Sequence, residues 1–240
     1  MQSALGERVK SLTDRFNASQ SDYKIVPVFK GTYPEVMTAG IAAYRAKAAP
    51  HILQVFEVGT ATMMGAKGAI KPVGQIMKES GENFDIASYI PAVVSYYSTS
   101  KGEMLSFTFN SSTALYYYNK DMFDKAGLDS SKLPNTWSDL MIAAAKLKAS
   151  GVTQCAYTTT WPSWIHMENF ASWHNMPLAS KNNGFDGFDA RLVVNTPLML
   201  RHLEDISAWS KQGLFTYSGR TSEGDAKFYG GECAILAASS

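Results

Sequence analysis

The alternation of short apolar runs with amphipathic segments is the feature that most constrains the fold of this chain. Apolar runs of strand type occupy residues 23–29, 52–56, 105–109, 115–119, 155–160 and 233–238. Helical patterns occupy residues 5–16, 34–48, 59–64, 73–80, 120–126, 136–151, 163–173 and 196–213. Strands that alternate with helices indicate parallel-rich sheets flanked by helices. The sequence therefore predicts an α/β fold.

Several helix starts carry a local signal. Thr136 is followed three residues later by Asp139, which is typical of a capped helix start. Pro34 and Pro197 suit a first helical position, because the N–H that proline lacks has no partner there. Pro27 interrupts the first apolar run and favours an edge strand or a bulge at that point. Residues 81–103 predict a mixed loop.

The polar stretch 110–113 separates two apolar runs and predicts a boundary between two lobes, residues 1–110 and 111–240. A helical pattern begins almost at Met1, and the last apolar run ends two residues before Ser240. Because a buried parallel strand is normally followed by a crossover helix, we expect an architecture that is incomplete at both termini.

Charge and motifs narrow the classes of function. The chain has 22 basic and 21 acidic residues, a net charge of +1, which gives no broad field for nucleic acid or an anionic membrane. No apolar run approaches the ~20 residues that span a bilayer. The sequence has no Cys-x-x-Cys, His-Glu-x-x-His, phosphate-binding-loop or Gly-x-Ser-x-Gly motif. We therefore expect no metal, no cofactor, no nucleic-acid partner and no membrane-spanning segment.

Candidate ligand contacts follow the ends of the predicted strands, where open α/β sheets bind ligands. Hydroxyl, carboxylate and aromatic side chains collect at these positions, and the set comprises Tyr33, Glu57, Asn110, Ser111, Ser112, Trp161, Trp164, Ser239 and Ser240. Hydroxyls and a carboxylate pair with the OH groups of a small polyol, an aromatic face covers its C–H side, and serines can donate to phosphate. The set contains no nucleophile with an adjacent base, so it indicates binding and not catalysis.

Each of these residues also has an ordinary structural interpretation. Tyr33 can be a loop tyrosine, and Glu57 can cap a helix or pair with a cation. Ser112 suits a turn or a hinge, and Trp161 and Trp164 can simply pack in the core. The shared position at strand ends gives the set more weight than any single member.

Several longer stretches resemble bacterial glycerol-3-phosphate-binding proteins, which supply ABC importers. The matching stretches are 52–64, 109–113, 117–121, 125–129, Trp161-Pro-Ser-Trp164 and 180–187. The Tyr-Asn-Lys and Ala-Gly-Leu elements recur widely among carbohydrate-binding proteins, so they identify the superfamily only. The stretches 52–64, 161–164 and 180–187 are more specific.

This resemblance implies a two-lobed periplasmic-binding-protein-like II architecture that closes on sn-glycerol 3-phosphate or a glycerophosphodiester. The resemblance implies six ligand contacts from within that set, with both tryptophans and Glu57 beside the glycerol part of the ligand. They are Tyr33, Glu57, Ser112, Trp161, Trp164 and Ser239. The resemblance also implies a periplasmic monomer, which is not an enzyme and delivers its ligand to a membrane permease.

Part of the family's ligand site has no match in this sequence. Later contacts of the family, a glycine, a tyrosine and an arginine suited to the phosphate, have no counterpart in the sequence. We therefore expect the chain alone to bind glycerol 3-phosphate weakly or not at all. The alternatives are a carbohydrate-binding protein of the same superfamily and, with less support, a glycerophosphodiester-processing enzyme.

Cys155 and Cys233 each begin a predicted strand of the second lobe. If the two strands are neighbours, an oxidising periplasm permits a disulfide between them. Two buried free thiols are the alternative, and the sequence leaves both open.

Overall fold

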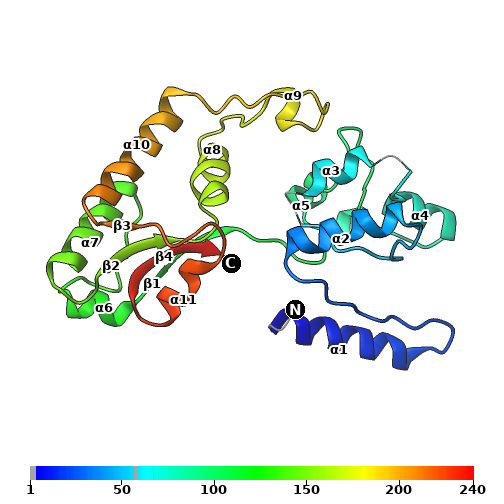
Figure 1. The fold of residues 1–240 in the computed structure, drawn as a ribbon, viewed down its shortest axis with the longest axis horizontal. Helices are drawn as coiled ribbons and strands as arrows, with labels where there is room; N and C mark the ends of the chain where they lie inside the picture. Colours follow the sequence, from blue (N-terminus) through cyan, green and yellow to red (C-terminus); the bar gives the residue numbers. More distant parts are fainter. Residues whose placement is uncertain (1–3, 57–58, 67) are drawn as a thin grey trace. The chain divides into compact units, whose positions relative to one another are not determined.

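A computed structural model of the protein describes residues 4–56, 59–66 and 68–240. The chain divides into two compact units, Met1–Phe107 and Thr108–Ser240. Both units are drawn in Figure 1, and each is described by itself below.

Unit 1 is built from helices in its described part. They are α1 (Ala4–Ser19), α2 (Tyr33–Arg45), α3 (Thr60–Gly65), α4 (Val73–Ser80), a 3₁₀-helix (Ile86–Ser88) and α5 (Pro91–Tyr96). The helices predicted at 5–16, 34–48, 59–64 and 73–80 are confirmed. The 3₁₀-helix and α5 occupy a stretch that was predicted as loop, although Pro91 at the first turn of α5 is an ordinary helix-start signal.

The strands predicted at 23–29, 52–56 and 105–109 are wrong. These segments lack strand pairing in the structure, and the apolar side chains of Val26 and Ile52 are 67% and 80% exposed. In the first segment, the backbone of Ile25 forms hydrogen bonds with the side chain of Asn17 and not with a neighbouring strand. The Asn17 amide accepts the N–H of Ile25 at 2.7 Å and donates to the carbonyl of Ile25 at 2.9 Å.

Unit 2 contains strands and helices in alternation. Its strands are β1 (Ala114–Tyr118), β2 (Cys155–Thr159), β3 (Phe215–Thr216) and β4 (Cys233–Ser239). Its helices are α6 (Lys120–Lys125), α7 (Trp137–Ala149), a π-helix (Trp164–Asn169), α8 (Phe170–Trp173), α9 (Ser180–Asn183), α10 (Pro197–Lys211) and α11 (Glu223–Tyr229). The strands predicted at 115–119, 155–160 and 233–238 and the helices at 120–126, 136–151 and 196–213 are confirmed. The helix predicted at 163–173 is divided between the π-helix and α8, whereas β3, α9 and α11 were not predicted.

The four strands of unit 2 form one mixed sheet in the order β1-β4-β2-β3. β2 runs parallel to β4 and β3, and β1 runs antiparallel to β4. Every residue of β2 and residues 233–238 of β4 are buried. Helix α7 contacts β2, α10 contacts β3, and α11 contacts β4 and β2. A parallel-rich sheet covered by helices confirms the α/β class.

The predicted capped start of α7 is present. The N–H of Asp139 donates to Oγ1 of Thr136 at 3.1 Å, and the Thr136 hydroxyl donates to Oδ2 of Asp139 at 2.8 Å. From this start, α7 buries Leu140, Ala144 and Leu147 against the core of the sheet. The hydrogen bonds at its start and the burial of one apolar face thus both stabilise α7.

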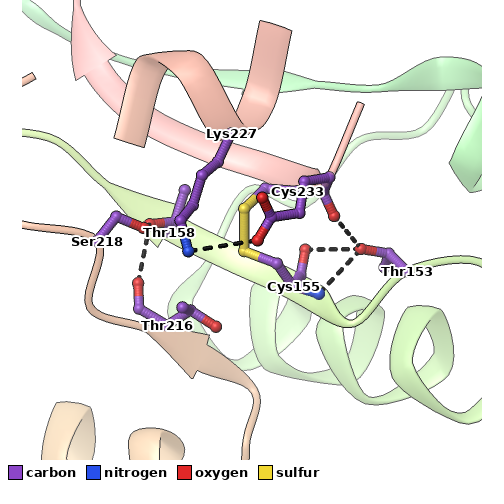
Figure 2. A network of polar contacts seen from close by, with 8 residues as sticks. Thr153, Cys155, Thr158, Thr216, Ser218, Lys227 and Cys233 are labelled. Atoms are coloured by element: carbon purple, nitrogen blue, oxygen red, sulfur yellow. Dashed lines mark hydrogen bonds and ion pairs between the residues drawn. A yellow bond between two sulfur atoms is a disulfide. The ribbon is translucent and has the colours of Figure 1, made fainter. Parts of the chain in front are cut away.

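Cys155 and Cys233 form a disulfide, so the alternative of two free thiols is wrong. They are directly paired in the parallel register of β2 and β4, with their Cα atoms 4.4 Å apart and both side chains buried. Figure 2 shows the bridge beside Thr153. The Thr153 hydroxyl accepts the N–H of Cys155 at 3.0 Å and lies 2.6 Å from the carbonyl oxygen of Glu232. The bridge and this hydroxyl together join the starts of the two central strands.

Loss of the disulfide is expected to destabilise unit 2. The bridge joins residues 78 positions apart, and the entropy of closing such a loop corresponds to about 4 kcal/mol. The double variant Cys155→Ala with Cys233→Ala should therefore lower the free energy of unfolding by about that amount, measured by urea denaturation. A reductant should destabilise the wild type and leave the double variant unchanged. Equal urea midpoints for the reduced and oxidised wild type would contradict this role.

Candidate functional site

Four predicted site residues lie at one end of the sheet of unit 2. Because β1 runs antiparallel to β4, the start of β1 lies beside the end of β4, and Ala114 pairs with Ser239. Beyond this pair, the N–H of Ser240 donates to the carbonyl of Thr113 at 3.0 Å. Ser112 is therefore close to Ser239. We name this end the strand-end edge and define it as residues 110–113, 160–164, 217–222 and 239–240.

Ser112 reaches this edge by a different route from the one predicted. The prediction placed it after a strand at 105–109, which the structure does not form. Ser112 instead precedes β1, whose reversed direction places its amino end at the carboxyl ends of β2 and β4. The strand assignment that led to Ser112 was wrong, and its role as a ligand contact stays a prediction.

Trp161 follows β2 directly and has an unusual backbone. Its φ is +44°, in the left-handed region that bulky residues rarely adopt. Its N–H donates to the carbonyl of Thr221 at 2.9 Å, and its carbonyl accepts the N–H of Ile165 at 3.0 Å. Such a conformation costs on the order of 1–3 kcal/mol and persists only where surrounding contacts hold it, often at a binding site.

Trp164 begins the π-helix. Its carbonyl accepts a hydrogen bond from Nδ2 of Asn169 at 2.8 Å, and its side chain is partly buried against the core cluster of unit 2. A π-helix is rare and frequently marks a functional site. Trp164 thus packs against the core and also lies in the strand-end edge. The sequence had offered these two positions as alternatives.

Ser239 ends β4 and is half-buried. Its carbonyl accepts the phenol hydroxyl of Tyr117 at 2.9 Å, which holds the end of the strand in place. Ser112 is exposed in the segment before β1. The strand-end edge therefore contains two of the predicted serines and both predicted tryptophans, and these residue types suit the hydroxyl and C–H groups of a small polar ligand.

The two remaining predicted residues belong to the first half of the chain. Tyr33 is the first residue of α2 in unit 1, and its ring stacks on Phe56 with centroids 5.3 Å apart and planes 5° apart. Glu57 lies outside the described residues. In the described part of the chain, the strand-end edge unites Ser112, Trp161, Trp164 and Ser239.

The loop from β3 to α11, residues 217–222, also reaches the strand-end edge and was not predicted from the sequence. Figure 1 shows this segment running from β3 to the end of the sheet where the chain terminates. β3 has two residues, and no periodic pattern can identify so short a strand. A short apolar run after Gly213, residues 214–217, is the signal that could have identified it.

Two buried histidines, His166 and His202, pack beside Trp137 in unit 2. Nε2 of His166 lies 3.2 Å from the hydroxyl of Tyr157, and the rings of His166 and His202 are 5.5 Å apart. Among the residues that the structure describes, Nδ1 of His166 and Nε2 of His202 find no hydrogen-bond partner. Burial, and to a lesser extent His202, lowers the pKa of His166 to about 3. Burial lowers the pKa of His202 to about 4, against the opposing charge of Asp205.

These histidines predict a loss of stability in mild acid. The unfolded chain takes up protons near pH 6.5, whereas the folded chain does so only near pH 4 and 3. The free energy of unfolding should therefore fall as the pH drops below 6.5, by about 2 kcal/mol for each histidine at pH 5. Urea denaturation at pH 7.5 and pH 5 measures this difference.

The control compares two single variants. His202→Phe keeps a ring against Phe170, whose ring centroid is 3.8 Å from that of His202, and should remove about half of the acid sensitivity. His51→Gln replaces an exposed histidine and should leave the acid sensitivity unchanged. The same pH dependence in the wild type and His202→Phe would show that His202 does not titrate in this way.

A pocket of about 300 Å³ lies elsewhere in unit 2, on α6 and α7. Its lining is mainly apolar and includes Phe123, Leu128, Leu133, Pro134 and Ile142. None of the predicted site residues lines it. Its position gives no reason to move the candidate site away from the strand-end edge.

Within residues 4–56, 59–66 and 68–240, no three histidine, cysteine, aspartate or glutamate side chains gather as metal ligands. No helix in the described ranges is long and apolar enough to cross a membrane.

Open α/β sheets of this kind commonly bind small ligands at the carboxyl ends of their strands. Residues 3–240 match the family described as bacterial extracellular solute-binding protein, and the chain belongs to that family. A relative from Agrobacterium fabrum, the sn-glycerol-3-phosphate-binding periplasmic protein UgpB, is 52% identical over 100% of this chain and 55% of the relative. UgpB of Yersinia enterocolitica is 54% identical over 100% of this chain and 54% of the relative. The chain spans about half the length of the curated relatives it matches, and their names confirm the resemblance drawn from the sequence.

Solved structures show the same fold at lower identity. UgpB from Mycobacterium tuberculosis, in complex with glycerophosphocholine, has a TM-score of 0.78 at 19% identity, over 99% of this chain and 59% of that chain. The sugar-binding protein MalE from Xanthomonas citri has a TM-score of 0.73 at 18% identity, over 99% of this chain and 58% of that chain. These likenesses support the periplasmic-binding-protein-like fold.

Proposed function

We propose that this chain provides part of the solute-binding component of an ABC importer in the periplasm. Its ligand is sn-glycerol 3-phosphate or a glycerophosphodiester, which it delivers to the permease subunits. The observation that carries the proposal is the gathering of Ser112, Trp161, Trp164 and Ser239 at one end of a single sheet. Relatives that are 50–54% identical along the whole chain are named for the same ligand.

The chemistry of the strand-end edge supports binding of a small polyol phosphate. Serine hydroxyls exchange hydrogen bonds with glycerol OH groups and donate to phosphate oxygens, while an indole covers C–H groups. We propose that units 1 and 2 correspond to the two lobes and that Tyr33 and Glu57 contribute from the first lobe.

We further propose that the protein acts as a monomer and is not an enzyme. The four segments of the strand-end edge contain no histidine, cysteine or carboxylate that could serve as general base. A hydroxyl without such a neighbour is a weak nucleophile. Hydrolysis of a glycerophosphodiester by the purified chain would contradict this part of the proposal.

A titration with two kinds of ligand tests the function. Amide NMR signals of unit 2 should shift with millimolar sn-glycerol 3-phosphate and should not shift with maltose. The opposite order would favour a carbohydrate-binding protein of the same superfamily. Absence of a response to either ligand would reject the proposed function for this chain.

The variant Trp161→Gly separates binding from folding. Glycine adopts φ of +44° without strain, so the free energy of unfolding should stay within about 1 kcal/mol of the wild type. The affinity for sn-glycerol 3-phosphate should fall about 10-fold, because the indole is lost. Trp173→Ala serves as the control, because it removes an indole that is 49% exposed in α8. Alanine replaces glycine there because Trp173 lies in a helix. An undiminished ligand response in Trp161→Gly would remove Trp161 from the site.

A further inference from the structure

Arg220 lies in the loop between β3 and α11, and both sides of it are attached to the end of β2. On one side, the hydroxyl of Ser218 lies 2.7 Å from Oγ1 of Thr158, which also lies 2.8 Å from the carbonyl oxygen of Thr216. Figure 2 shows Ser218 and Thr216 gathered around Thr158. On the other side, the carbonyl of Thr221 accepts the N–H of Trp161 at 2.9 Å. The backbone of Arg220 is therefore held beside Trp161.

The packing of α11 fixes where this loop ends. Gly224 is buried, and a Cβ at this position would lie 2.8 Å from the carbonyl oxygen of Thr159. The first turn of α11 thus approaches β2 more closely than any larger residue allows. Gly219, with φ of +141°, makes the turn that precedes Arg220. Two glycines and two hydroxyl contacts together define the position of the arginine.

Arg220 is the only charged residue in the four segments that form the strand-end edge. Its side chain is exposed, and among the described residues no hydrogen bond or ion pair is found for it. The carboxylate nearest in sequence, Glu223, already accepts the N–H of Thr221 at 2.7 Å and its hydroxyl at 3.2 Å. Lys227, the next cation along the chain, pairs instead with Glu232 at 3.3 Å. The guanidinium is thus available for an external anion.

We propose that Arg220 binds the phosphate group of the ligand. This inference rests on the proposed function, because it assigns the charged half of the same ligand to a residue at the same edge. A guanidinium donates two parallel hydrogen bonds to phosphate oxygens, which a lysine or a hydroxyl cannot do. Ser112 and Ser239 then bind on either side, and the indole of Trp161 covers the glycerol carbons. The sequence motifs indicated no cation suited to the phosphate, and the unpredicted β3–α11 loop supplies one.

Three variants of the chain test this role by NMR titration. Arg220→Gln should weaken binding of sn-glycerol 3-phosphate at least about 10-fold, the effect of losing a charge-assisted hydrogen bond. Arg220→Lys keeps the charge and should retain an intermediate affinity. Arg201→Gln removes an exposed arginine of α10 and should bind as the wild type does. Unchanged urea midpoints in all three variants verify that the fold is retained.

Uncharged glycerol and added salt complete the test. Any shifts that glycerol causes should be the same in Arg220→Gln and the wild type, because glycerol has no phosphate. Rising salt should weaken phosphate binding in the wild type more than in Arg220→Gln. If the wild type and Arg220→Gln bind glycerol 3-phosphate equally tightly, the role of Arg220 is overturned while the proposed function stands. A wild-type chain with no response to glycerol 3-phosphate overturns the proposed function, and the assignment of Arg220 with it.

Discussion

The central strand β4 pairs with β1 on one side and β2 on the other, in opposite senses, and the candidate site depends on this arrangement. The antiparallel pair brings the segment before β1 to the end of β4, and the parallel pair brings the residues after β2 to the same end. Burial of residues 233–238 and the disulfide at the start of β4 keep this register from slipping. A shift by one residue would reverse the face of every side chain on the strand.

Much of unit 2 could be predicted because its local and nonlocal signals agree. Residues 155–160 and 233–238 are apolar runs of strand length, and both find parallel neighbours in the sheet. Residues 23–29 carry the same kind of signal, yet they form no ladder. A strand is stable only when a second segment pairs with it, and that segment can lie anywhere in the sequence. The hydrogen bonds between Asn17 and Ile25 could not be inferred from apolar periodicity at all.

The candidate site shows the same division between predictable and unpredictable parts. Trp161 and Ser239 follow strands that are recognisable from their composition, so the rule for strand ends identified them directly. Arg220 follows a strand of two residues, which has too little sequence for any periodic pattern. Its position depends on contacts with Thr158 and Trp161, about 60 residues away in the chain, which the sequence does not display.

Residues 161–169, next to the strand-end edge, combine several departures from ordinary local structure. Within nine residues the chain has a tryptophan at positive φ, a π-helix and a buried histidine with an unpartnered nitrogen. Each of these features costs free energy, whereas the sheet and α7 beside them follow the usual rules for burial and capping. Foldable sequences keep local and global preferences consistent except where function requires otherwise. Under the proposed function, this cost at residues 161–169 serves to hold two indoles in fixed positions at the end of β2.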